Sequence, residues 1–271
     1  MGPVLGSELP SLQPKGTAPK AANATEVDLE LLLMVDVSRS MSPRELELQR
    51  KGYAAALRSD AVWAAIGQGF LGTIALSFVE WAGTQKERVP WRLIETRQDL
   101  FDFADLLTVQ FDPTLRRTSI SEALIFGMRS LEENSFDGLR RVIDVSGDGP
   151  NNQGRPVLRA RDSVLAKGIT INGLPLMTRD GIGGDWHLEE LDVYYRTCVT
   201  GGQGSFVIPV YSWPDFAEAV KRKLILEIAA IVPPEPLPVV PIQAWSGTKD
   251  PTDCRIGEKI WEFYRQRWWE P

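Results

Sequence analysis

Long apolar runs, histidine and cysteine are scarce in this sequence, and each scarcity excludes a class of protein. A helix that crosses a bilayer needs about 20 mostly apolar residues, and no run of that length occurs. The two cysteines, Cys198 and Cys254, are too few for a cysteine-based zinc site. The single histidine, His187, has no second histidine or nearby nucleophile with which to form a catalytic triad. We therefore predict no transmembrane segment, no cysteine-based zinc site and no triad hydrolase.

Positive charge is in the minority. Lys and Arg total 30 against 36 Asp and Glu, which gives a formal net charge of −6. No basic stripe stands out that could follow a phosphate backbone, so we expect no nucleic-acid partner. The 43% hydrophobic and 24% charged fractions of the 271 residues are ordinary for a globular protein. This length and composition favour one folded domain with tails.

The composition divides the chain into three parts. Residues 1–26 are rich in Pro, Gly, Ala and Ser without periodicity, which predicts a disordered leader. This leader lacks the apolar core of a signal peptide, although Ala22-Asn23-Ala24 fits the small-residue pattern of a cleavage site. Residues 27–231 have the periodicities of a folded domain, and 232–271 form a Pro-rich spacer followed by an aromatic segment.

The folded part alternates between strand and helix patterns. The run from Leu29 to Val35 is almost wholly apolar and ends at Asp36, as in a strand that is buried on both faces of a parallel sheet. The alternation predicts a doubly wound α/β fold with a mostly parallel, six-stranded sheet and helices on both faces. We expect strands at 29–36, 72–81, 89–94, 141–146, 169–176 and 205–210, and helices at 43–58, 99–109, 119–131, 157–166, 187–195, 213–231 and 256–269.

Oxygen-bearing side chains follow the first strand as Asp36-x-Ser38-x-Ser40. On a loop that leaves a strand, these alternate residues can turn toward one point. Oxygen ligands suit a hard cation, Mg²⁺ above all, with Mn²⁺ and Ca²⁺ as alternatives. Only one of the three ligands is charged, so the ion would remain electron-poor and could take a further carboxylate from outside the protein. The alternative reading is that these residues only cap helices and form turns.

This pattern resembles the first part of the metal-ion-dependent adhesion site (MIDAS) of von Willebrand factor A domains. In that family a Thr from a second loop and an Asp from a third complete the site. Thr118 stands just before an apolar helical stretch and Asp148 follows another apolar strand, so both match the family pattern. The resemblance implies a metal site of Asp36, Ser38, Ser40, Thr118 and Asp148. It also implies a non-enzymatic adhesion or assembly module whose protein partner offers an acidic residue.

A second resemblance concerns the compartment. The stretch 192–207 looks like a bacterial branch of the family of unknown function, whose members usually carry export signals. Cys198 and Cys254 allow one disulfide, whose loop of roughly 55 residues could add about 4 kcal/mol of stability and would tie the C-terminal segment to the domain. Such a bond implies an oxidising compartment. We therefore expect a periplasmic or secreted protein. The alternative to the disulfide is that Cys198 and Cys254 are two unrelated buried thiols.

Two other functions stay open from the sequence. Acidic loops at strand ends also serve metal-assisted hydrolysis or phosphoryl transfer, but no nucleophile is paired with a base here. The third reading is a structural assembly component that acts through the Pro-rich run 233–238 and the Trp-rich tail. That aromatic tail either folds back on the domain or presents an exposed patch to a partner.

Overall fold

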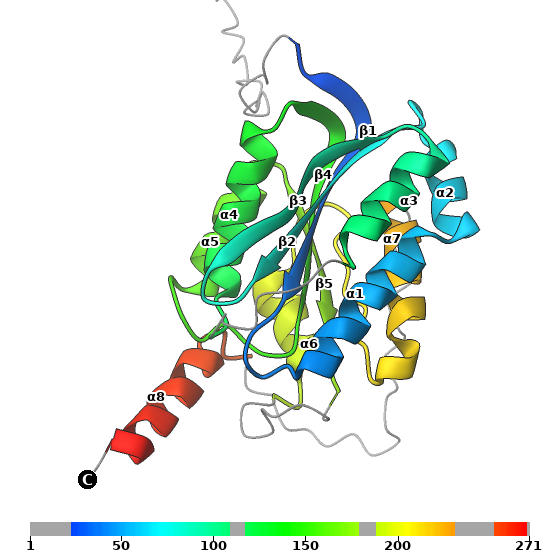
Figure 1. Ribbon diagram of the computed structural model, residues 1–271. Helices are drawn as coiled ribbons and strands as arrows, with labels where there is room; N and C mark the ends of the chain where they lie inside the picture. Colours follow the sequence, from blue (N-terminus) through cyan, green and yellow to red (C-terminus); the bar gives the residue numbers. More distant parts are fainter. Residues whose placement is uncertain (1–22, 109–116, 179–187, 231–251, 270–271) are drawn as a thin grey trace, which may run out of the picture.

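The computed structural model describes residues 23–108, 117–178, 188–230 and 252–269, without the side chains of 267–269 (Figure 1). Most of the expected leader, His187 and the Pro-rich run 233–238 lie outside the described residues. The two C-terminal tryptophans of the third functional reading are among the residues whose side chains are not described.

A twisted sheet occupies the middle of the molecule, and within the described residues it has the strand order β3-β2-β1-β4-β5. Neighbouring strands pair in parallel except at the edge, where β3 runs antiparallel to β2. The prediction of a mostly parallel α/β sheet is confirmed. The strands are β1 (Thr25–Asp36), β2 (Ile74–Trp81), β3 (Gln85–Ile94), β4 (Phe136–Gly147) and β5 (Thr170–Pro175).

The central strand β1 is buried from Val27 to Asp36. It lies between β2 and β4, so both of its edges are hydrogen-bonded and both of its faces are covered. Leu32, for example, is opposite Ser77 of β2 and Ile143 of β4. The apolar run of β1 therefore forms the middle of the core, as its sequence pattern predicts.

A sixth ladder strand is not present in the described residues, so the prediction of six strands is not confirmed. The segment 205–210 lies beside β5 but makes only two isolated parallel bridges, Gly173 to Val207 and Leu176 to Val210. Between these bridges stands Pro175, which has no N–H to donate to the neighbouring segment. The proline thus interrupts a ladder that its flanking residues would otherwise continue.

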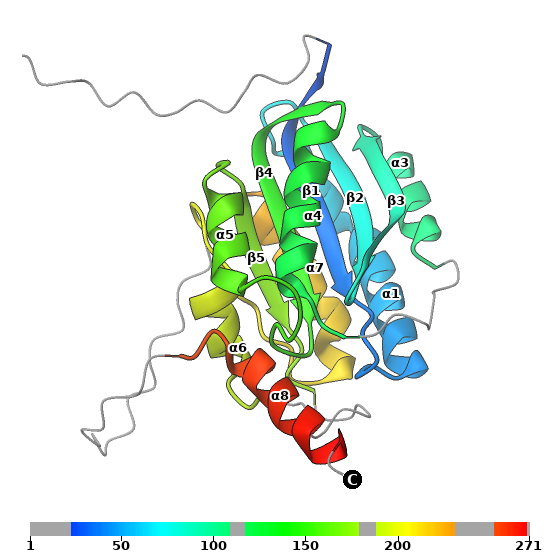
Figure 2. The ribbon, with the colours of Figure 1, turned by 90° about the vertical axis from the view of Figure 1, so that its left-hand side faces the viewer.

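Helices cover both faces of the sheet (Figures 1 and 2). The first core, between the sheet and one helical layer, contains residues of α1, α2, α3 and α7. The second core, on the opposite face, contains residues of α4, α5, α6 and η2. Helix α2 is missing from our sequence prediction. The helices are α1 (Pro43–Leu57), α2 (Asp60–Gly67), α3 (Arg97–Leu106), α4 (Ile120–Glu133), α5 (Val157–Leu165), α6 (Leu191–Tyr194), the π-helix η2 (Tyr195–Val199), the 3₁₀-helix η3 (Trp213–Asp215), α7 (Phe216–Ile228) and α8 (Ile256–Trp269).

None of the helices in the described parts of the chain combines the length and apolarity needed to cross a bilayer.

A buried ionic cluster joins α7 to the sheet. Lys223 of α7 lies 2.6 Å from a carboxylate oxygen of Asp144 on β4 and also pairs with Glu227 one helical turn later. The amide of Asn172 on β5 donates a hydrogen bond of 2.9 Å to Glu227. Burial, followed by the charge of Asp144, raises the pKa of Glu227 to about 7, although Lys223 and Asn172 oppose this shift. Because the pKa of Glu227 in the unfolded chain is 4.5, the folded protein retains a proton at Glu227 between about pH 4.5 and 7, where the unfolded chain has lost it.

We expect Glu227→Gln to flatten the pH dependence of stability between about pH 4.5 and 7. In this window the folded wild type binds more protons at Glu227 than the unfolded chain does, so rising pH lowers its free energy of unfolding relative to the variant. Urea denaturation of both proteins at several pH values measures the difference. Glu218→Gln, on the exposed side of the same helix, is the control. Parallel pH profiles for wild type and Glu227→Gln would contradict the expectation.

Candidate metal centre

The first loop of the candidate site leaves β1 and leads into α1. The Ser38 amide donates a hydrogen bond of 2.7 Å to Oδ1 of Asp36, and the Met41 amide donates one of 3.1 Å to the Ser38 carbonyl. Ser42 then caps α1, where its amide donates to the Glu45 carboxylate and its hydroxyl accepts from the Glu45 amide. These local bonds fix the loop as a tight turn between strand and helix.

A chain of hydrogen-bonded side chains connects this loop to the loop after β4. The hydroxyls of Ser38 and Ser40 lie 2.9 Å apart, and the Ser40 hydroxyl donates a bond of 2.9 Å to Oδ1 of Asp148. Asp36 is completely buried and Ser38 is nearly so. The structure therefore gathers four of the five predicted residues from two loops that are far apart in sequence.

Thr118 comes from a third loop that is joined to the Asp148 loop through Asn152. The Thr118 amide donates a bond of 3.0 Å to Oδ1 of Asn152, and the Thr118 carbonyl accepts one of 2.9 Å from the Asn152 amide. Ser119 caps α4, and its amide bonds to the carbonyl of Ala82 just after β2. Thr118 is thus held at the carboxyl edge of the sheet, which is where open α/β sheets bind ligands.

Electrostatics at this edge favour a bound cation. Burial, followed by the charge of Asp148, raises the pKa of Asp36 well above its usual value. Burial also raises the pKa of Asp148 to about 6, with a contribution from the charge of Glu45, while the hydrogen bond from Ser40 lowers it. Oδ2 of Asp36 is buried and has no hydrogen-bond partner among the described residues. A positive ion would offset both the repulsion and the lost solvation of these carboxylates.

The composition of the site sets it apart from common metal centres. In the described portion of the chain, no three His, Cys, Asp or Glu side chains form a group that could hold a metal. The candidate site has two carboxylates, Asp36 and Asp148, and its other predicted ligands are hydroxyls. Such a set suits a hard cation that retains some water ligands.

Three nearby residues lie outside the predicted ligand set. Gly147 ends β4 directly against Asp36, and the phenol of Tyr195 lies beside both. Glu45 lies in the first turn of α1, and its charge contributes to the raised pKa of Asp148. No sequence pattern marks Tyr195, because it reaches the site from a π-helix that is formed late in the chain.

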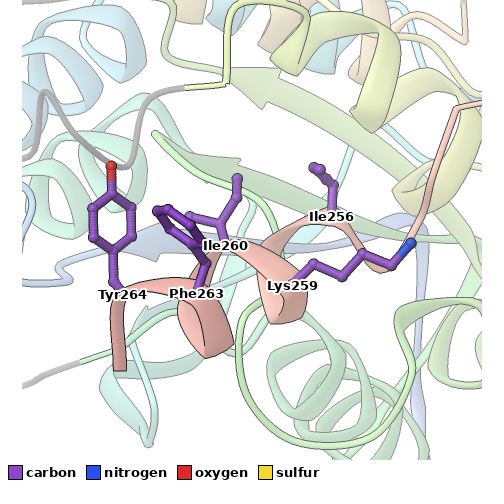
Figure 3. A pocket seen from close by; sticks show the side chains of 5 residues that line it. All are labelled: Ile256, Lys259, Ile260, Phe263 and Tyr264. Carbon is purple, nitrogen blue, oxygen red and sulfur yellow. The ribbon is translucent and has the colours of Figure 1, made fainter. Parts of the chain in front are cut away.

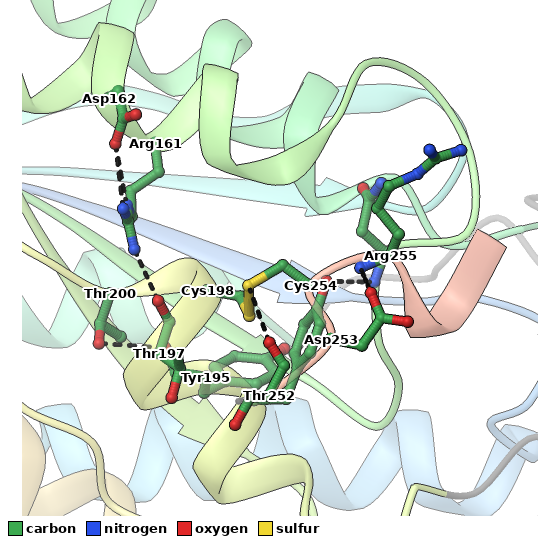
Figure 4. The surroundings of a disulfide bond; sticks show 12 residues. Arg161, Asp162, Tyr195, Thr197, Cys198, Thr200, Thr252, Asp253, Cys254 and Arg255 are labelled. Carbon is green, nitrogen blue, oxygen red and sulfur yellow. Dashed lines mark hydrogen bonds and ion pairs between the residues drawn. A yellow bond between two sulfur atoms is a disulfide. The ribbon is translucent and has the colours of Figure 1, made fainter. Parts of the chain in front are cut away.

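Cys198 and Cys254 form a disulfide, which decides between the two readings of the cysteines (Figure 4). Cys198 lies in η2, three residues after Tyr195, and Cys254 lies just before α8. The bond therefore attaches the start of the C-terminal segment to the part of the chain that carries Tyr195.

This arrangement has the fold of solved structures of the von Willebrand factor A type. Proximal thread matrix protein 1 from the mussel byssus, solved with a zinc-occupied MIDAS motif, aligns with TM-score 0.52, 14% identity and coverage of 77% of this chain and 49% of its own. A von Willebrand factor type A protein from Catenulispora acidiphila aligns with TM-score 0.50 and 14% identity, and the alignment covers 74% of this chain and 43% of that protein. BatB from Bacteroides thetaiotaomicron aligns with TM-score 0.50 and 18% identity, and the alignment covers 74% of this chain and 99% of BatB. The chain thus spans about half of the mussel protein and nearly all of BatB.

The family model described as "Protein of unknown function (DUF1194)" matches residues 26–232. The chain belongs to this family. No curated protein matches its sequence.

We expect Gly147→Ala to destabilise the protein by about 1–3 kcal/mol, the usual cost of overpacking a core. A Cβ at this position would lie 2.8 Å from the Tyr195 hydroxyl, 2.9 Å from Oδ2 of Asp36 and 3.2 Å from the Trp81 ring. Gly149→Ala is a matched control, because a Cβ there has no atom within 4 Å. Chemical denaturation measures both variants, and equal stabilities would refute the close packing of Asp36 against β4.

Proposed function

We propose that this protein is a metal-dependent protein-binding module that acts in adhesion or assembly. Asp36, Ser38, Ser40, Thr118 and Asp148 would hold Mg²⁺ directly or through water, with Mn²⁺ and Ca²⁺ as alternatives. The observation that carries the proposal is the chain of hydrogen bonds from Ser38 through Ser40 to Asp148, beside a buried Asp36 with one carboxylate oxygen free of hydrogen bonds within the described residues.

The charge of this ligand set explains why a partner carboxylate is needed. Two carboxylates and three neutral hydroxyls leave a divalent ion without surplus negative charge around it. The ion would therefore attract an external Asp or Glu as a further ligand, and oxygen ligands of this kind are those that hard cations prefer. The mussel protein with a zinc-occupied MIDAS motif supports this proposal by its fold, although its metal need not be the ion used here.

Binding is favoured over catalysis by the way in which the third nearby carboxylate is used. Glu45 accepts hydrogen bonds from the Ser42 amide and from the indole N–H of Trp213 at 3.1 Å. It therefore caps a helix and orients a tryptophan, where a metal-assisted hydrolase would use a free base near the ion. We accordingly propose a non-enzymatic role.

The disulfide supports a location outside the reducing cytosol, because such bonds persist in oxidising compartments. We propose a periplasmic or secreted protein.

We expect Asp36→Asn to abolish saturable binding of Mg²⁺ and Mn²⁺ while the fold stays intact. The change preserves shape but removes one of the two anionic ligands. Isothermal titration calorimetry of chelator-treated protein measures binding, and circular dichroism checks the fold. Asp137→Asn, an exposed position on β4, is the control for the loss of one charge. Absence of binding in wild type, or equal binding in Asp36→Asn, would overturn the metal assignment.

Partner capture requires a separate experiment with the same variants. A protein retained on immobilised wild type should be lost after chelation and on Asp36→Asn, and should remain on Asp137→Asn. Retention that survives chelation would contradict capture through the metal. Mg²⁺-dependent hydrolysis of a generic phosphate ester, lost in Asp36→Asn, would replace the binding proposal with the enzymatic one.

A further inference from the structure

Helix α8 lies beneath the carboxyl ends of the strands, next to the loops of the candidate site (Figures 1 and 2). Its first turns contact two of these loops, the one that delivers Thr118 and the one that follows Asp148. Three contacts on one side of the helix, from Gly257, Glu258 and Trp261, make this attachment. Residues three and four apart share a helix face, so the three contacts form one surface.

Gly257 brings the helix backbone directly onto the loop after Asp148. A Cβ at this position would lie 2.1 Å from the carbonyl oxygen of Asn151 and 2.8 Å from its carbonyl carbon. These are backbone atoms, so no flexible side chain could move aside. The close approach therefore requires glycine.

Glu258 contacts the side chain of the same residue. The side-chain amide nitrogen Nδ2 of Asn151 donates a hydrogen bond of 2.9 Å to Oε1 of Glu258. Asn151 is completely buried, and its Oδ1 accepts a bond of 3.0 Å from the amide of Ser121 in the first turn of α4. A single side chain thus links α8 to both loops, since Ser121 follows Thr118 and Asn151 follows Asp148.

Arg117 adds a contact directly beside Thr118. Its guanidinium carbon lies 4.6 Å from the centre of the Trp261 ring, within the range of a cation–π interaction. Arg117 also has a φ of 67°, which is uncommon for a residue other than glycine. The Trp261 contact therefore attaches α8 to the residue just before Thr118.

The disulfide ties the start of α8 to η2, close in sequence to a further partner of Asn151. The backbone N–H of Asn151 donates a hydrogen bond of 3.2 Å to the phenol of Tyr194, and Cys198 follows Tyr194 four residues later. Ile256 packs on the second core, whereas Phe263, which lines the same pocket on α8 as Ile256, is 59% exposed (Figure 3). The helix is therefore anchored through its first turns.

From these contacts we infer that α8 is part of the metal site, with Gly257 and Glu258 as positioning residues that act through Asn151. They fix the distance between the loops of Thr118 and Asp148. The inference rests on the proposed function for the role of metal, but the loop positioning itself can be measured without metal.

The test compares Glu258→Ala, Glu258→Gln and Gly257→Ala with wild type by Mn²⁺ titration and by amide hydrogen exchange. Groups that hydrogen-bond to a metal ligand typically change metal affinity by 10–100-fold. Glu258 and Gly257 act one contact further out, through Asn151, so we expect Glu258→Ala and Gly257→Ala to bind Mn²⁺ about tenfold more weakly, at the lower end of that range. The amides of Thr118 and Ser121 should exchange faster in both variants. Glu258→Gln retains an acceptor for Asn151 and should behave as wild type.

The control is Glu262→Ala, which removes the same charge from an exposed position of α8. Cys198→Ser combined with Cys254→Ser releases the anchor and should reproduce the effect of Glu258→Ala on both measurements. Wild-type affinity together with wild-type exchange in Glu258→Ala and Gly257→Ala would overturn the inference. If wild type itself bound no Mn²⁺, the proposed function would fail, and exchange at Thr118 and Ser121 would alone decide the positioning role.

Discussion

The burial of the Asp36 carboxylate at the end of the central strand is the constraint on which the candidate site depends. A carboxylate that leaves water must gain hydrogen bonds or a positive charge in return. The Ser38 amide satisfies Oδ1, whereas Oδ2 lies beside the Tyr195 hydroxyl and the Gly147 backbone without a hydrogen-bond partner in the described residues. The close approach of β4 is possible because residue 147 is glycine. A cation at this position would supply the missing compensation for both Asp36 and the neighbouring Asp148.

The sheet provides the geometry for this compensation. Parallel pairing of β1 with β2 and β4 brings three carboxyl ends to one edge, and the loops that follow are joined by hydrogen bonds between side chains and backbone. Asn151 and Asn152 are central to these contacts, because each accepts an amide hydrogen from the loop of Thr118 or the first turn of α4. The positions of the loops at the candidate site therefore depend on the neutral side-chain amides of Asn151 and Asn152, which the charge pattern of the sequence does not mark.

The C-terminal helix extends this set of contacts beyond the region that the family model covers, which ends at residue 232. Its contacts with Asn151 and Arg117 are made by only a few residues, and the disulfide compensates by keeping the helix near the domain. A tether of this kind lowers the entropy that the segment loses on docking. The rest of α8, including the exposed Phe263, projects away from the sheet.

Much of this architecture was determined by the sequence alone. The apolar run that ends at Asp36 and the spacing of Asp36, Ser38 and Ser40 are local signals, so they identified the central strand and the first loop of the candidate site. The sequence also allowed a disulfide between Cys198 and Cys254 without establishing it. Only the tertiary structure revealed the interrupted pairing at Pro175, the place of Tyr195 beside Asp36 and the contact between Glu258 and Asn151. These features depend on residues that are distant in the chain and meet only when the sheet and its covering helices have packed, so no local pattern encodes them.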